Sequence, residues 1–143
     1  MPFDIKTTEA QHYRRYVSQR RKAEGAVQQT PGLPGIIQRQ AGINDGKGFV
    51  FISHLGEIYP SGFLPISAGN VRRESLIEVY RNSQLFQNLR DSGRLGGKCG
   101  VCEFRNLCGG SRSRAYALTG DYLAEDPRCI YLPRAAAVHM SLS

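Results

Sequence analysis

The stretch Cys99–Gly110 reads CGVCEFRNLCGG and contains three of the four cysteines of the chain. Cys99, Cys102 and Cys108 follow one another at C-x2-C-x5-C spacing, and Cys129 lies 129 − 108 = 21 positions further on. Inert buried cysteines do not gather in this way, and a C-x-x-C redox pair would leave two thiols without a role. Four thiolates that bind one metal centre are the interpretation that uses all four residues.

The unequal gaps between the cysteines bear on the kind of metal centre. A structural zinc site usually combines two C-x2-C pairs, whereas here one pair is followed by two single cysteines. An iron-sulfur cube is wider than a zinc ion and can be held by a wrapping loop and a distant segment. Nearby glycines let the backbone approach closely and direct N–H groups at sulfur: Gly97, Gly100, Gly109 and Gly110. The pattern favours one 4Fe-4S cluster, with a four-cysteine zinc site as the alternative.

Basic residues near the cysteines fit an anionic centre. A four-iron cluster with four thiolates carries a net charge of about −2, and four cations lie close to it in sequence: Lys98, Arg105, Arg112 and Arg128. Each of them alone is equally well explained as a solvated surface charge.

Length and composition limit the remaining function classes. The 143 residues suffice for one domain, and no apolar run approaches the roughly 20 residues of a membrane-spanning helix. No secretory signal is visible, so we expect a cytoplasmic protein with reduced thiols rather than disulfides. The net charge is +7, but the densest basic group lies on one predicted helix: Arg14, Arg15, Arg20, Arg21 and Lys22. A solvated helix face explains that group, which disfavours nucleic acid as a partner.

Periodicity and turn residues predict a small α+β fold. An apolar run at 49–52, a turn at 53–56 and a return at 58–59 predict a β-hairpin. We expect four helices: one that Thr8 and Gln11 open as a capping box and that ends near Ala23, two short ones separated at Asn82–Ser83, and one from about Arg112 to Leu118. Ser111 and Gly120 would cap the last helix, whose positive N-terminus we expect to face the cluster. Residues 91–98 are predicted as a loop.

The cysteine spacing and its surroundings resemble the SPASM/twitch auxiliary-cluster region of radical S-adenosylmethionine enzymes. The resemblance extends to the hairpin GKGFVFISHLGEIYPSGFLPISAGNV, the helices in SLIEVYRNSQLFQNLRD and the EDPRC before the last cysteine. It implies a SPASM/twitch-like iron-sulfur domain over 46–133, with a β-hairpin, short helices and a cysteine-rich cluster-binding loop. It also implies that Cys99, Cys102, Cys108 and Cys129 bind one auxiliary 4Fe-4S cluster.

The departures from the family pattern concern a second cluster. A full SPASM domain holds two clusters, and the first takes one cysteine at the end of the hairpin and another four residues after the x5 cysteine. Ser61 and Arg112 stand at those two positions here. The resemblance therefore implies that the ligands of the first cluster are missing while those of the second are complete.

The family also implies a partner. Radical S-adenosylmethionine enzymes carry a C-x3-C-x2-C motif that this chain lacks, so the chain alone should not cleave S-adenosylmethionine. The resemblance implies that 1–24 is the end of a partial barrel, 25–45 a linker or mobile loop and 134–143 a tail. The rest of the barrel would be supplied in cis or by a separate chain. Without it, we expect residues 1–45 to be mobile or exchanged in a domain-swapped homo-oligomer.

Similar tails occur in oxidoreductases and maturases of cofactor biosynthesis, which resemble those of the pyrroloquinoline quinone, mycofactocin and haem d1 pathways. Their substrates imply that a peptide or a small molecule could dock here. The leading hypothesis is thus an electron-transfer or substrate-docking domain, and the alternative is a zinc-binding structural module with a protein or nucleic-acid partner. A hydrolase or transferase is disfavoured, because His12, His54 and His139 are far apart and no catalytic residue is identified.

Overall fold

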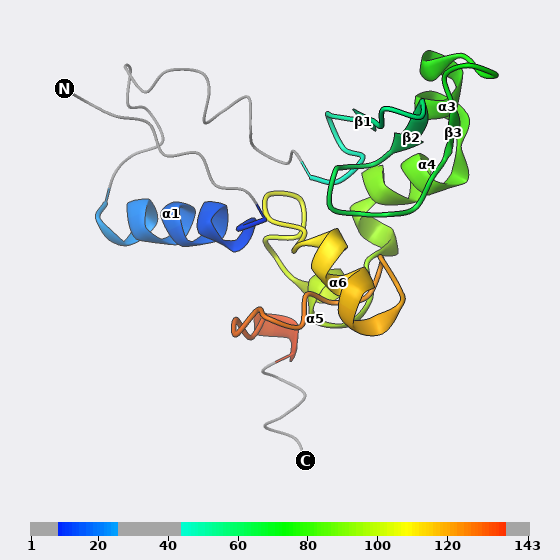
Figure 1. Ribbon diagram of the computed structural model, residues 1–143. Coiled ribbons are helices and arrows are strands. Elements are labelled where there is room, and N and C mark those ends of the chain that lie inside the picture. Colours follow the sequence, from blue (N-terminus) through cyan, green and yellow to red (C-terminus); the bar gives the residue numbers. More distant parts are fainter. Residues whose placement is uncertain (1–8, 26–43, 137–143) are drawn as a thin grey trace.

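The computed structural model describes residues 9–25 and 44–136. Among them, a small antiparallel sheet is followed by short helices, and the cysteine-rich segment comes after these (Figure 1). The elements, in chain order, are α1 (His12–Ala23), β1 (Phe51–Ile52), β2 (Glu57–Tyr59), β3 (Gly69–Asn70), α3 (Leu76–Asn82), α4 (Gln84–Arg90), the 3-10 helix η1 (Ser92–Arg94), α5 (Gly97–Val101) and α6 (Arg112–Thr119). The predicted α+β class is confirmed.

The hairpin forms where the sequence predicts it. β1 and β2 are antiparallel, with Ile52 opposite Ile58. The turn closes with the amide of Gly56 donating to the carbonyl of Ser53 at 2.9 Å, and Gly56 has a φ of +87° that favours glycine. The third strand, β3, was not predicted, because it is only two residues long and begins at Gly69.

Two adjoining hydrophobic clusters form the core, and helices α3 and α4 supply most of their residues. The first contains Ile58, Val79 and Phe86. The second contains Leu64, Leu85 and Leu89. The break between the two helices falls at Ser83, as predicted, although its side chain makes no capping hydrogen bond.

The ends of α6 confirm both predicted caps. The Oγ of Ser111 accepts the amide of Arg114 at 3.1 Å, and Gly120 ends the helix in the left-handed region with φ +77°. The predicted loop over 91–98 is wrong, because η1 and the start of α5 lie there. The short helix α5 is held from outside, by the carboxylate of Glu125, which accepts the amide of Lys98 at 2.6 Å.

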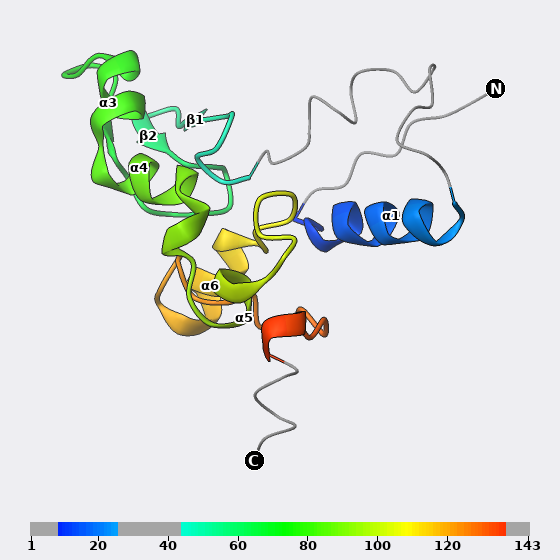
Figure 2. The ribbon, with the colours of Figure 1, turned by 180° about the vertical axis from the view of Figure 1, so that it is seen from behind.

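The start of α1 differs from its prediction. Gln11, rather than Thr8, occupies the N-cap position, and its side-chain amide donates to Asn44 Oδ1 at 3.1 Å instead of closing a capping box. The start of α1 lies beside the loop between α5 and α6 in both ribbon views (Figure 1, Figure 2). The predictions for 1–8, 26–43 and 137–143 fall outside the described residues, and exchange between copies stays a prediction.

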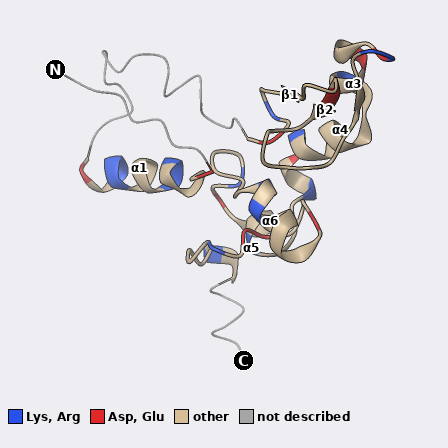
Figure 3. Cartoon of the chain, viewed as in Figure 1, with Lys and Arg blue, Asp and Glu red and all other residues tan. Residues whose placement is uncertain are grey.

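The basic residues are distributed over several elements. Figure 3 shows Lys and Arg on α1, on the later helices and in the loops, without one continuous stripe in that view. Among the described residues, no helix combines the length and the apolar character that crossing a lipid bilayer requires.

We expect replacement of Phe86 by alanine to lower the free energy of unfolding by about 3–5 kcal/mol, because its fully buried ring fills the core against Ile58 and Val79. Urea unfolding followed by circular dichroism measures this. The control is Ile77→Ala on α3, whose side chain is 59% exposed and should change stability by less than about 0.5 kcal/mol. Equal effects of the two substitutions would contradict the assigned core.

Candidate metal centre

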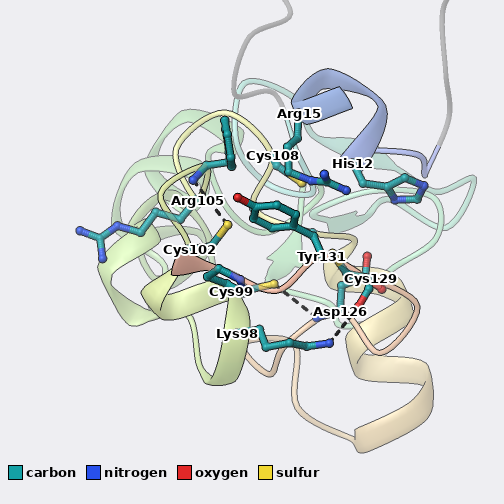
Figure 4. Close-up of a pocket in the computed structure, with 14 residues that line it drawn as sticks. His12, Arg15, Lys98, Cys99, Cys102, Arg105, Cys108, Asp126, Cys129 and Tyr131 are labelled. Atoms are coloured by element: carbon teal, nitrogen blue, oxygen red, sulfur yellow. Dashed lines mark hydrogen bonds between the residues drawn. The ribbon is translucent and has the colours of Figure 1, made fainter. Parts of the chain in front are cut away.

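All four cysteines line one pocket, although they come from three separate segments. Cys99 lies in α5, Cys102 directly follows that helix, Cys108 ends the next loop, and Cys129 lies beyond α6. All four are free thiols. Figure 4 shows the four side chains around the same space. The structure therefore brings together the complete set of residues that the sequence predicts for the site.

Backbone amides donate to two of the sulfur atoms. The amide of Phe104 lies 3.4 Å from Cys102 Sγ, and the amide of Asp126 lies 3.4 Å from Cys99 Sγ. These two amides belong to nonglycine residues, whereas a third, that of the predicted Gly110, acts on the thiol of Cys108, whose pKa burial raises and this amide lowers. Such hydrogen bonds stabilise sulfur when it carries negative charge.

Burial controls the protonation of the thiols in the absence of a metal. It raises the pKa of Cys102 and of Cys108, even though a backbone amide next to each acts in the opposite direction. These two thiols are thus neutral at neutral pH unless a cation replaces the proton. The site is therefore unsuited to a free thiolate nucleophile at Cys102 or Cys108.

Asp126 fixes the segment that precedes Cys129. Its side chain is 1% exposed and accepts two hydrogen bonds from Arg114, at 2.6 and 2.8 Å, and one from the amide of Ser111 at 2.9 Å. Burial alone would raise the pKa of Asp126, but these donors outweigh it and lower the pKa to about 2. Because the folded pKa is lower than the ordinary value of 3.8, the stabilisation is present above about pH 4 and is lost as the pH falls towards 2.

Two amides at the N-terminus of α6 donate to carboxylates: that of Ser111 to Asp126, and that of Ser113 to Asp45 at 3.0 Å. Asp45 and Asp126 are remote in sequence from the start of the helix, and both satisfy its positive end. The sequence pattern did not identify these partners. The predicted effect of this helix end on the cluster stays a prediction.

Two predicted cations lie at the pocket. Lys98 Nζ donates to the carbonyl of Cys129 at 2.8 Å, and Arg105 Nη1 donates to the carbonyl of Gly100 at 2.9 Å. Both cations therefore help to hold the cysteine-bearing segments in place. Arg128 is exposed and is not among the described residues that line the pocket.

Helix α1 adds residues that sequence reasoning missed. His12 and Arg15 line the pocket, and the guanidinium of Arg15 lies 4.3 Å from the ring centroid of Tyr131. Tyr131 also packs edge-on against Phe104, with 5.6 Å between the ring centroids. His12 Nδ1 and Arg15 Nε are buried without a hydrogen-bond partner in the described part of the chain. Only the three-dimensional fold brings this helix to the cysteines, since about 75 residues separate them in sequence.

Of the other two histidines, His54 lies in the exposed hairpin turn and is not among the described residues that line the pocket. His139 lies outside the described residues.

The positions that would serve a second cluster are occupied by protein hydrogen bonds. Ser61 is 2% exposed, and its Oγ accepts the amides of Phe63 and Leu64 at 3.1 Å. It also lies 3.5 Å from Ser113 Oγ, which in turn donates to Asp45 at 3.0 Å. The polar groups around Ser61 thus satisfy one another.

The pocket presents four soft thiol donors to one space. Gly110 leaves room beside it, because a Cβ there would lie 3.1 Å from Cys99 Sγ. These features fit an iron-sulfur cluster.

Comparison with known proteins shows which families this chain resembles. The family model of the SPASM iron-sulfur cluster-binding domain matches residues 44–103. An AdoMet-dependent heme synthase of Methanosarcina barkeri is 44% identical over 90% of this chain. A pre-heme d1 synthase of Dinoroseobacter shibae is 33% identical over 80% of it, and a PqqA peptide cyclase of Bradyrhizobium diazoefficiens is 35% identical over 62%.

The matches cover only part of these relatives. They span 37% of the heme synthase, 29% of the pre-heme d1 synthase and 25% of the peptide cyclase. The family model itself includes Cys99 and Cys102 and ends before Cys108. The heme-synthase match, by contrast, extends over 129 residues. Residues 44–103 of this chain are therefore similar to the SPASM family of iron-sulfur cluster-binding domains.

Proposed function

We propose that Cys99, Cys102, Cys108 and Cys129 bind one 4Fe-4S cluster, and that the chain is an auxiliary electron-transfer or substrate-docking domain of a radical S-adenosylmethionine oxidoreductase or maturase. The observation that carries the proposal is the single pocket that all four thiols line. The C-x2-C-x5-C-x20-C spacing lacks the second C-x2-C pair that is usual in structural zinc sites, and this supports a cluster over zinc.

The chain's own residues would hold and shield the cluster. The amides of Phe104 and Asp126 donate to sulfur, and the ring of Tyr131 covers the pocket between Phe104 and Arg15. A bound cluster supplies one-electron transfer. Since four cysteines would bind four irons, no iron is left open for a substrate, and we do not assign Lewis-acid catalysis to this site.

The remainder of the enzyme would be a radical S-adenosylmethionine barrel. The relatives are about three times as long as the matched region, which leaves room for such a barrel in cis, and a separate chain is the alternative. The PqqA peptide cyclase supports a peptide as the class of substrate, and the two heme-related synthases support a tetrapyrrole-like small molecule. A cytoplasmic location fits the reduced thiols.

Metal analysis of the anaerobically purified chain tests the proposal. We expect a brown protein with about four iron and about four sulfide per chain. A colourless protein with about one zinc per chain, also after anaerobic reconstitution with iron and sulfide, would instead favour the zinc module.

Replacing Cys108 by serine should abolish cluster binding and lower the melting temperature by at least about 4 °C, because the loop around the pocket depends on the metal for its order. Iron content and thermal unfolding measure the two effects. The control is Val101→Ser, at a 53% exposed position between two of the cysteines, which should retain the iron. Full iron content in the Cys108 variant would refute its role as a ligand.

Gly110→Ala should also remove the cluster, for a steric reason. A Cβ there would lie 2.6 Å from Arg112 Nη2, 2.8 Å from Asp126 Cβ and 3.1 Å from Cys99 Sγ, so the residues on both sides of the thiol would have to move. Gly120→Ala is the matched control, because Gly120 has a similar positive φ but no atom within 4 Å of the added Cβ. Both variants should lose about 1–2 kcal/mol of stability through backbone strain. Only the first should lose iron, and equal iron contents would count against this geometry.

A further inference from the structure

Arg112 is a buried cation that lacks a carboxylate partner. It is 1% exposed, so its guanidinium is almost completely removed from water. Within the described part of the chain, no carboxylate forms an ion pair with it. The buried carboxylate of Asp126 is paired with Arg114, at 2.6 Å, and not with Arg112.

Burying an uncompensated charge costs several kcal/mol, and arginine does not escape this cost by losing its proton. Carbonyl dipoles provide part of the compensation: Nη1 of Arg112 donates to Ala124 O at 2.6 Å and to Tyr122 O at 3.1 Å. These contacts fix the plane of the guanidinium but supply no negative charge. The fold therefore calls for an anion at the remaining side of Arg112.

The atom found on that side is a cysteine sulfur. Nη2 of Arg112 lies 3.8 Å from Cys99 Sγ. The two atoms meet beside Gly110, where no side chain comes between them and where an added Cβ would be within 3.1 Å of both. Hydrogen bonds of this type are strong when the acceptor is a thiolate and weak when it is a thiol.

We infer that Arg112 is the internal counter-ion of the metal centre: its buried positive charge beside Cys99 Sγ sets the reduction potential of the cluster. The inference rests on the proposed function. One-electron reduction makes the cluster with its four thiolates more negative, so a fixed positive charge stabilises the reduced form more than the oxidised form. Arg112 therefore raises the reduction potential. It is a positioning residue, since it acts through Cys99.

Potentiometric titration of the reconstituted, anaerobic 143-residue chain tests the inference, with the reduced cluster followed by electron paramagnetic resonance. Arg112→Gln should shift the reduction potential to a more negative value. Arg112→Lys, which keeps the charge, should have a reduction potential close to that of the wild type. The matched control is Arg128→Gln, since Arg128 is next to Cys129 in sequence but is exposed and is not among the described residues that line the pocket, and solvent should reduce its effect to a minor shift.

The outcomes separate the inference from the function on which it rests. An unchanged potential in Arg112→Gln, or the same shift in the lysine and control variants, overturns the counter-ion role. If Arg112→Gln takes up no cluster, retention by Arg112→Lys supports the role and loss in both variants overturns it. Circular dichroism verifies that each variant is folded.

If the reconstituted wild-type protein contained no iron and no sulfide, the proposed function itself would be refuted. The counter-ion role is then decided with Zn²⁺ as the probe, in a competition assay with a chromophoric chelator. Arg112→Gln should bind Zn²⁺ about 10-fold more weakly than the wild type and Arg112→Lys. Equal affinities would overturn the inference.

Discussion

The contact between Asp126 and Arg114 is the interaction on which the site depends. Three thiols lie within ten residues of one another, but the fourth is separated from them by the whole of α6. Asp126 accepts the Arg114 guanidinium and the Ser111 amide with its side chain, while its own amide donates to Cys99 Sγ. One buried residue thus ties the segment of Cys129 to α6 and to the first cysteine. Without it, a flexible loop would carry the fourth thiol.

The sequence was informative where structure is determined locally. Ser111 and Gly120 mark the ends of α6 because capping depends on a few neighbouring residues, and the hairpin follows from alternation and a glycine turn. The cysteine spacing likewise identified residues that gather at one pocket. Each of these signals is contained within a dozen residues or in the identity of one residue type.

Sequence reasoning failed where a distant partner decides the local structure. Glycines at 96 and 97 indicate a loop, yet the carboxylate of Glu125 holds the α5 turn together. The first amides of α6 donate to Asp45 and Asp126, two partners that the sequence pattern did not identify. The role of α1 at the pocket depends on its contact with Tyr131, more than 110 residues later. None of these partners produces a sequence pattern at the position whose structure it determines, so only the fold identifies them.

The contact between Arg15 and Tyr131 has a consequence for the order in which the molecule is assembled. Ribosomal synthesis proceeds from the N-terminus, so α1 and the first three thiols emerge while the segment of Cys129 and Tyr131 does not yet exist. The pocket then has the side formed by α1 but lacks the side that Cys129 and Tyr131 form. Tyr131 completes the enclosure when it stacks on Arg15. A metal centre that is delivered before this contact forms can enter an open pocket. A metal centre that is delivered afterwards requires Arg15 and Tyr131 to separate.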